Sequence, residues 1–349
     1  MRRGYLRFRR QAAGILGIVF LISGILKLWD PVGTMLIVTE YLKFLHLPGL
    51  IPAAKVMGIA LPVTECAVGI GLITGVLRKL SAFVVYVMLG GFTLLTLALW
   101  IFDAPMDCGC FGQAVHLTHA QSFWKNVILL VIAVIAFTPF REFGRAKVHR
   151  GVAAVMAMLA IIAATIYSNL YLPVVDFTAF NWGSQLFASL DDEATEKEFR
   201  RAPILSFRDA QGEYQDELAA TGKVVVFSVY DADSADWARL EEHYRIASMS
   251  EALPLVLVSA PEEQLQLPPD IKPYFSDYKT LITLNRSNGG GTYFYYGELI
   301  HKWSVRQFPD DLVADINGDP DVLATRHVTR RRVTAQGFCV ALLAILVLL

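Results

Sequence analysis

The sequence predicts a polytopic membrane protein in which an all-α bundle of helices is followed by an α/β domain. Apolar residues make up 54% of the 349 residues and charged residues 18%, a balance too apolar for a soluble protein of this length. Many of the apolar residues lie in uninterrupted blocks, each long enough to cross a hydrocarbon core. Between residues 173 and 325, by contrast, short apolar runs alternate with amphipathic stretches, which is typical of alternating strands and helices.

Five apolar blocks precede the α/β region, and we expect each to form a transmembrane helix. They are Ala12–Trp29, Ile51–Leu77, Leu80–Phe102, Phe123–Phe140 and Gly151–Leu172. The first four predict a four-helix membrane bundle over residues 1–140, and residues 141–175 then hold a cytoplasmic loop and the fifth span. A sixth block, Val333–Leu349, predicts a C-terminal transmembrane helix over residues 326–349. Four arginines, however, immediately precede this last block.

The distribution of basic residues predicts the orientation of the spans. Arginines crowd the first ten positions, Arg78 and Lys79 separate the second and third spans, and further basic residues follow the fourth. Residues 103–122 contain neither lysine nor arginine. Because basic residues are retained in cytoplasmic loops, we expect a cytoplasmic N-terminus. Residues 103–122 would then face the oxidising side, where disulfides persist.

Residues 176–325 are expected to form an extracytoplasmic domain with a thioredoxin-like order of elements, β-α-β-α-β-β-α. The expected elements are, in order, the strand Lys223–Tyr230, the helix Asp231–Glu251, the strand Leu253–Ser259 and the helix Tyr274–Leu284. A hairpin follows, with strands Thr292–Tyr296 and Leu299–Trp303 and a turn at Gly297-Glu298, and the helix Pro309–Ile316 comes last. A redox-active fold of this kind carries Cys-x-x-Cys after the first core strand, where this sequence has Asp231–Ser234. No cysteine occurs between Cys110 and Cys339. The domain is therefore predicted to bind or scaffold a partner without dithiol chemistry.

Cys108 and Cys110 are the candidate catalytic residues. A bridge between cysteines two positions apart is near the limit of disulfide reach, although Gly109 relaxes the backbone between them. Strained, exposed disulfides are prone to exchange. Asp107 adjoins Cys108 and is expected to raise the pKa of that thiol, with no basic residue in the loop to oppose it.

Three interpretations of the cysteine pair stay open: a redox-active pair, a structural disulfide, and thiols that are free or bind a metal. The metal interpretation would add His116 and His119 as ligands. The one-residue gap between the cysteines differs from the usual spacing of zinc ligands, so no metal site is predicted. Thr34–His46 has an amphipathic pattern and is expected to cover the cysteine loop.

Glu65 and Lys27 are the supporting candidates inside the membrane, where ionisable residues are costly and often functional. Glu65 falls near the middle of the second span and Lys27 near the outer end of the first. An ion pair between them is one alternative, and a protonated Glu65 bonded within the bundle is another. A third makes Glu65 a proton-handling group beside a quinone. Cys66 and Cys339 lie in apolar helices and are expected to be inert.

The residues that carry a family resemblance are "SGILKLWDPVGT" (23–34), "TEC" (64–66), "LITGVLRKL" (72–80) and "DCGCFG" (107–112). Together they resemble the DoxX and MauE group of bacterial four-helix membrane proteins, especially longer members with an appended cysteine-poor, thioredoxin-like domain. The resemblance implies residence in the bacterial cytoplasmic membrane and a redox role. Members of the group are linked to disulfide formation during methylamine dehydrogenase maturation or to thiol and sulfur redox balance.

The leading hypothesis is a thiol-disulfide oxidoreductase whose Cys-Gly-Cys pair exchanges electrons with an extracytoplasmic thiol or disulfide protein, or with a quinone. The expected partners are that protein and the lipid bilayer, without nucleic acid. The alternative is a non-enzymatic assembly or scaffold factor whose cysteines form a structural disulfide. A transporter is a weaker third hypothesis, because the spans lack an evident inverted repeat.

Overall fold

The computed structural model describes residues 2–106, 108–138, 147–191, 194–261, 268, 271–309 and 311–348. The chain divides into two units, Met1–Asn169 with Ala335–Leu349, and Leu170–Thr334. Each unit is described by itself below.

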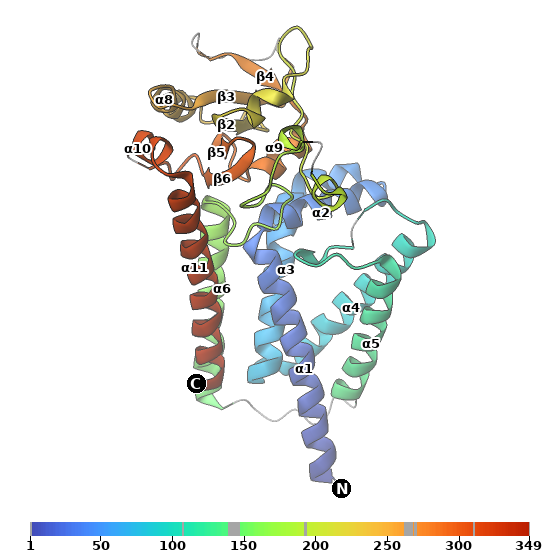
Figure 1. Cartoon of the computed structure of the whole chain (residues 1–349). Coiled ribbons are helices and arrows are strands. Elements are labelled where there is room, and N and C mark those ends of the chain that lie inside the picture. The colour runs from blue at the N-terminus through green and yellow to red at the C-terminus, as the bar shows by residue number, and fades with distance from the viewer. Residues whose placement is uncertain are drawn as a thin grey trace. The chain divides into compact units, whose positions relative to one another are not determined.

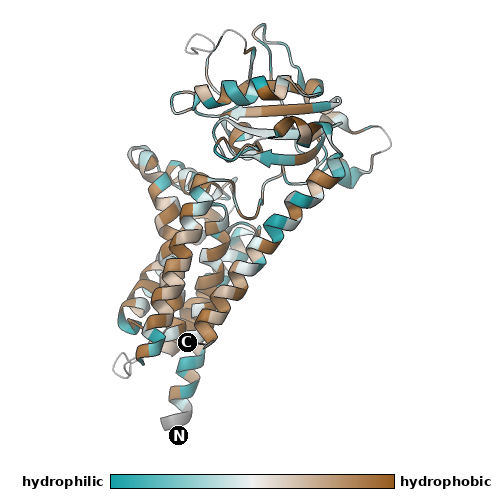
Figure 2. Cartoon of the chain, turned by 90° about the vertical axis from the view of Figure 1, so that its left-hand side faces the viewer, coloured by the Kyte–Doolittle hydropathy of each residue, from teal (hydrophilic) through white to brown (hydrophobic). Residues whose placement is uncertain are grey.

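The first unit is helical (Figure 1). Its elements are α1 (Arg2–Trp29), α2 (Pro31–Phe44), the 3-10 helix η1 (Pro48–Ala53), α3 (Ala54–Thr74), α4 (Arg78–Ile101), the short strand β1 (Cys110–Gln113), α5 (His119–Phe137), α6 (Val148–Leu170) and the last part of α11 (Pro320–Leu348). The long helices of this unit are coloured mostly as hydrophobic in Figure 2. Helices α1, α3, α4 and α5 share a buried core that includes Leu16, Val68, Val85 and Ala133.

Five stretches within the described residues are long and apolar enough to cross a membrane. They are Tyr5–Trp29, Pro48–Thr74, Arg78–Ile101, His119–Phe137 and Val148–Leu170. They correspond to the five predicted blocks, with boundaries that differ by a few residues. Helix α11 is not among them, so the predicted sixth span stays a prediction. The four-helix bundle as a defined fold and the orientation of the spans also stay predictions.

Local sequence explains where these helices begin and end. Asp30 caps α2 by accepting a hydrogen bond from the Gly33 amide, and Pro31 occupies the first helical position, as expected at a helix start. Gly75 ends α3 in the left-handed conformation. Thr118 and Gln121 form a reciprocal capping box that fixes the start of α5.

Glycines let α1 and α3 approach closely. A Cβ atom added to Gly69 would lie 2.7 Å from the carbonyl oxygen of Gly17, and one added to Gly24 would lie 2.8 Å from the carbonyl oxygen of Pro62. Small residues at helix contacts are how membrane helices pack backbone against backbone. This close contact brings the C-terminal end of α1 against the part of α3 that carries Glu65.

The second unit contains a five-stranded mixed sheet in the order β4-β3-β2-β5-β6. The strands are β2 (Lys223–Val229), β3 (Leu253–Val258), β4 (Pro273–Phe275), β5 (Gly290–Tyr295) and β6 (Glu298–Trp303). The pairs β2–β3 and β3–β4 are parallel, whereas β2–β5 and β5–β6 are antiparallel. The remaining elements are η2 (Phe187–Ser189), α7 (Glu196–Phe199), η3 (Asp216–Ala220), α8 (Trp237–Ser248), α9 (Tyr278–Leu284), α10 (Leu312–Asn317) and the first part of α11.

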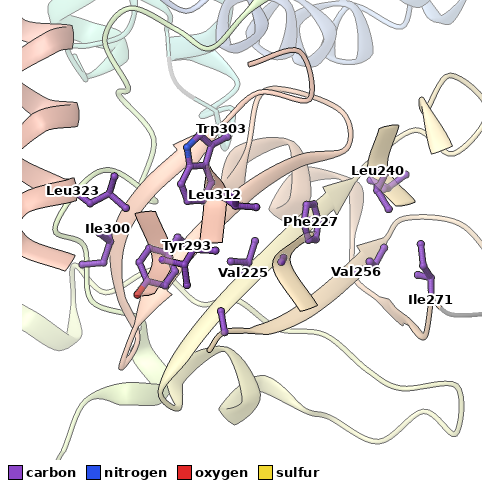
Figure 3. Packing of buried hydrophobic residues seen from close by; sticks show 14 of the residues in the cluster. Val225, Phe227, Leu240, Val256, Ile271, Tyr293, Ile300, Trp303, Leu312 and Leu323 are labelled. Atoms are coloured by element: carbon purple, nitrogen blue, oxygen red, sulfur yellow. The ribbon is translucent and has the colours of Figure 1, made fainter. Parts of the chain in front are cut away.

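Both faces of this sheet are covered, because successive side chains of β2 point to opposite sides. Val225 and Phe227 join a cluster with Leu240 of α8 and Leu312 of α10 (Figure 3). Val224 and Val226 join a second cluster with Leu281 of α9 and several residues from the irregular segment before β2. The expected mixed α/β domain is therefore present, and its likeness to thioredoxin stays a prediction.

Two details of the predicted domain were wrong. Strand β4 was not predicted, since three residues are too few to show a periodic pattern. The hairpin turns at Tyr296-Gly297 rather than at Gly297-Glu298, because Tyr295 pairs with Glu298. Both turn residues have positive φ, +47° and +77°, as a tight two-residue hairpin loop requires.

Candidate functional site

The cysteine pair lies at the entry to β1, in the connection between α4 and α5. The Sγ atoms of Cys108 and Cys110 are 2.6 Å apart, and neither cysteine is in a disulfide. Cys108 is 4% exposed, whereas Cys110 is only half-buried. Cys110 is therefore the more accessible sulfur. Asp107, predicted to raise the pKa of Cys108, lies outside the described residues.

A tight turn brings the two sulfurs together. Gly109 has φ +58° and Gly112 has φ +61°, and the Gly112 amide donates a 3.0 Å hydrogen bond to the Gly109 carbonyl. A Cβ atom on Gly109 would lie 2.5 Å from Cγ2 of Ile37. Both the backbone conformation and this contact restrict the position to glycine.

Helix α2 contacts the cysteine loop, as its amphipathic pattern predicts. Ile37 packs against Gly109, and one helical turn later the Tyr41 hydroxyl donates a hydrogen bond to the Cys108 carbonyl. These two side chains lie on the same face of α2, because residues four apart are neighbours on a helix. The helix thus holds the backbone on both sides of the bond between Cys108 and Gly109.

Lys27 and Glu65 form a buried ion pair. The Lys27 ammonium lies 2.6 Å from Glu65 Oε1 and 2.8 Å from Oε2, and it donates to the Ser23 hydroxyl at 2.9 Å. The two charged side chains are 4% and 2% exposed. Of the three alternatives that the sequence left open for Glu65, the structure shows the ion pair with Lys27. Because α3 begins at Ala54 rather than Ile51, Glu65 lies nearer that end of the helix than the apolar block suggested.

Ser23 connects the ion pair to the cysteine loop. Its hydroxyl lies 3.0 Å from Glu65 Oε2 and 2.8 Å from the carbonyl oxygen of Cys110. The three donors of Lys27 are then all used, two on Glu65 and one on Ser23. The hydrogen bonds of the Lys27 ammonium are therefore all made within the protein. The ion pair brings charge to the site but no free hydrogen-bond donor from Lys27.

The two thiols are electrostatically unequal. A hydrogen bond from the Cys108 thiol lowers the pKa of Cys110 to about 6, against burial, which raises it. The charges of Lys125 and Lys27 lower it further, and Lys125 also donates a hydrogen bond. The hydrogen bond to Cys110, followed by burial, raises the pKa of Cys108 well above its ordinary value. These shifts favour the thiolate form of Cys110 and the protonated form of Cys108.

Sequence reasoning missed the contribution of Lys125. The loop itself contains no basic residue, but the first turns of α5 bring Lys125 beside Cys110, with its ammonium 4.8 Å from the centre of the Phe111 ring. The capping pattern Thr118-x-x-Gln121 was the available signal. It fixes the start of α5, and therefore places Lys125 and Asn126 two turns inside that helix.

A cavity inside the first unit brings these groups together. About 50 Å³ is open to the centres of water-sized atoms, and the whole space between its walls is about 670 Å³, including the part open to solvent. Its polar lining comes from Ser23, Lys27, Thr34, Tyr41, Glu65, Thr96, Cys108, Cys110, Lys125 and Asn126. Most of the other lining side chains are aliphatic or aromatic, from α1, α2, α3, α4 and α5.

The structure gives the metal interpretation no support among the described residues, where no group of three or more His, Cys, Asp and Glu is placed to hold an ion. The ring of His119 instead forms a 2.9 Å hydrogen bond with the Ala104 carbonyl. Cys66 is fully buried in α3, where its sulfur fills the space beside Gly24. Cys339 lies on α11.

The position expected for a Cys-x-x-Cys in the α/β domain is a polar turn. The Ser234 hydroxyl donates to Asp231 Oδ2 at 2.6 Å. Asn288 accepts hydrogen bonds from the amides of Tyr230 and Asp231 and donates to the Asp231 carbonyl. The turn therefore has a satisfied hydrogen-bond network and no sulfur.

Comparison with known protein families gives a match over part of the chain. Residues 8–139 match the family model described as Methylamine utilisation protein MauE. This match and the five apolar helices fit a MauE-like membrane protein. The search of curated proteins and the search of solved structures each found no match.

Proposed function

We propose that this multi-pass membrane protein performs thiol-disulfide exchange through Cys108 and Cys110 with an extracytoplasmic protein. The membrane is the bacterial inner membrane, with the N-terminus in the cytoplasm and residues 176–325 outside. The observation that carries the proposal is the inequality of the two thiols. The half-buried Cys110 lies 2.6 Å from the sulfur of the buried Cys108, and this contact together with Lys125 lowers the pKa of Cys110.

This inequality assigns a role to each sulfur. When the pair is oxidised, a partner thiolate attacks the accessible Cys110 sulfur, the bond between the two cysteines breaks, and Cys108 leaves and takes up a proton. A second thiolate of the partner then attacks the mixed disulfide and releases Cys110. A thiol of low pKa leaves fastest, so the lowered pKa of Cys110 favours this release. The partner leaves with a disulfide and the pair is reduced.

The α/β domain has the role of docking the partner. It contains no cysteine, and the turn at 231–234 is satisfied by its own hydrogen bonds. A thioredoxin-like domain of this kind would raise the local concentration of a bound protein without reacting with it.

The family description concerns methylamine utilisation. We take from it a membrane role in such a process, with a protein thiol as the reacting group. The Cys-Gly-Cys turn lies within the matched residues 8–139, and this supports placing the chemistry in the membrane unit.

A second candidate is a non-enzymatic assembly factor in which the cysteines form a structural bridge. The low exposure of Cys108 and the contacts of Ile37 and Tyr41 favour this alternative, because they hold the loop rigidly. It predicts that a Cys108→Ser, Cys110→Ser double variant, if folded, retains full function.

The test is covalent trapping in cells. In a Cys108→Ser variant, the Cys110 thiolate attacks the disulfide of an oxidised partner and forms a mixed disulfide. This adduct persists because Cys108, the thiol that would displace the partner from Cys110 in the reverse reaction, is gone. We expect a reducible adduct, with mass analysis locating the link at Cys110. Cys110→Ser should trap far less, since Cys108 is buried, and Cys339→Ser is the matched control without effect.

Absence of any adduct in Cys108→Ser, together with full function of the double variant, would overturn the proposal in favour of the assembly factor. Removing residues 176–325 should lower the yield of adduct without moving the link to another cysteine. A reporter fused after residue 145 should be active only in the cytoplasm, and one near residue 215 only outside.

A further inference from the structure

We propose that the cavity beneath the cysteine pair binds the ring of a lipid-soluble quinone, which reoxidises Cys108 and Cys110. This inference rests on the proposed thiol-disulfide exchange and names the electron acceptor for the same site. It concerns the cavity lined by α1, α2, α3, α4 and α5.

The side chains that line the cavity suit a quinone, because they combine the two sulfurs with apolar groups. Both sulfurs line the cavity, so an occupant is in contact with the groups to be oxidised. Beside them lie apolar side chains that suit a hydrophobic ring, among them Phe20, Leu89, Phe92 and Leu129. Small-molecule sites are typically apolar with a few convergent polar groups.

Hydrogen-bond donors for a quinone oxygen come from α5. Asn126 is 1% exposed, and the hydrogen bond that the structure gives its amide nitrogen is a long one, 3.4 Å to the Thr96 hydroxyl. An amide nitrogen has two donors, and a buried donor without a good partner is costly. Asn126 therefore has a donor to offer an occupant of the cavity that it lines.

Lys125 and Lys27 supply positive charge on the same cavity. Lys27 has its three donors committed to Glu65 and Ser23, so it acts through charge alone. Lys125 contacts the Cys110 sulfur and the Phe111 ring. Positive charge stabilises the electron density that develops on a quinone oxygen during reduction.

The cavity offers more room than a single water needs. About 50 Å³ of it is open to the centres of water-sized atoms. One water needs only roughly 10–15 Å³ of occupied volume, so the cavity is larger than a site for a single water.

The electron and atom balance is complete with the quinone as co-reactant. The Cys110 thiolate adds to a ring carbon and forms a carbon–sulfur bond. The Cys108 sulfur then attacks the Cys110 sulfur, forming the disulfide and breaking the carbon–sulfur bond. The ring leaves with two electrons and takes two protons, one from the Cys108 thiol and one from water. Overall, two thiols and one quinone give one disulfide and one quinol.

The experiment uses the full-length protein in lipid nanodiscs with a short-chain ubiquinone as the probe. The pair is first reduced and freed of reductant, and the loss of quinone absorbance and of free thiols is followed together. We expect one quinol per disulfide formed in the wild-type protein and no reduction in Cys110→Ser. Cys339→Ser should react like the wild type.

Two cavity variants locate the binding site. Asn126→Leu removes the amide donor while keeping similar volume, and should raise the half-saturating quinone concentration about tenfold, the equivalent of one hydrogen bond of about 1.4 kcal/mol. Val19→Phe fills the cavity and should abolish quinone reduction. Val131→Phe makes the same change on an exposed position of α5 and should leave the reaction unchanged.

The readouts separate failure of this inference from failure of the proposed function. Each variant is also tested for exchange with a small soluble disulfide, a reaction that requires Cys110 but no quinone. Exchange without quinone reduction in the wild-type protein overturns the quinone site and keeps the proposed function. Equal quinone kinetics in Val19→Phe and Val131→Phe also overturns it, and leaves lipid or water as the occupant. Loss of both reactions in the wild type overturns both proposals.

Discussion

Lys27 and Glu65, 38 residues apart in sequence, form an ion pair in which the ammonium lies within 2.8 Å of both carboxylate oxygens. The pair is buried between α1 and α3, and Ser23 connects it to the carbonyl of Cys110. The ion pair is therefore linked through Ser23 to the backbone of the cysteine loop. Breaking the pair is expected to affect both stability and the thiols.

The first prediction concerns the stability of this pair. Glu65→Gln leaves the Lys27 charge buried without its partner, and the loss of unfolding free energy should be about 3–5 kcal/mol, typical of a broken buried ion pair. The Lys27→Met, Glu65→Leu double variant removes both charges and should lose much less. Thermal unfolding in detergent measures the difference. Equal losses of unfolding free energy in the single and double variants would contradict a coupled pair. The control is Lys43→Met, which breaks an exposed ion pair with Glu40.

The second prediction concerns Gly109. Substituting alanine requires a left-handed conformation and places a Cβ atom 2.5 Å from Ile37. We expect Gly109→Ala to separate the two sulfurs and to slow disulfide formation at least about tenfold, a cost of about 1.4 kcal/mol. The rate is measured by alkylation after an oxidant pulse. Combining Gly109→Ala with Ile37→Ala removes the steric contact but still requires a left-handed backbone at position 109. The double variant should therefore recover only part of the rate of disulfide formation. Full recovery would show that the backbone conformation imposes no constraint.

The third prediction concerns the pH dependence of Cys110. Because its pKa is lowered to about 6, the thiolate predominates above that pH. Alkylation of Cys110 should rise with a midpoint near pH 6 and level off above it, whereas an ordinary thiol has its midpoint near pH 8.5. Mass analysis of the labelled peptide measures each cysteine separately.

Two variants test which cause contributes more to the lowered pKa of Cys110. Cys108→Ala removes the largest cause, the hydrogen bond, and should move the midpoint to higher pH. Lys125→Met removes a smaller cause and should move it in the same direction by less. A midpoint that stays near 6 in Cys108→Ala would show that the second thiol does not stabilise the Cys110 thiolate.

The elements of the fold were largely predictable because their signals are local. Long apolar blocks define the five spanning helices, and β-branched runs define β2 and β3. Strand β4 was missed because only its pairing with β3 makes it a strand. The hairpin turn was misplaced by one residue because its position depends on the register between β5 and β6, which sequence does not show.

The cysteines of the candidate site were evident from the sequence, whereas most of the residues that surround them were not. Cys108, Cys110 and Gly109 are adjacent in sequence, so their spacing alone identified them. The Lys27–Glu65 pair was left open because its formation depends on how closely α1 and α3 pack. Lys125 and Tyr41 were missed because they reach the cysteines from other helices, and only the folded bundle brings them together.

The glycine contact between α1 and α3 has a genetic consequence. Gly17 and Gly69 touch neither a sulfur nor a charge, yet a side chain at either would push the helices apart. One turn of α3 separates Gly69 from Glu65, so the displacement would be felt where the carboxylate meets Lys27. A screen for inactive alleles should therefore recover substitutions at these glycines alongside those at the cysteines. Such alleles would resemble cysteine mutants in phenotype while leaving both cysteines and the ion pair intact in the sequence.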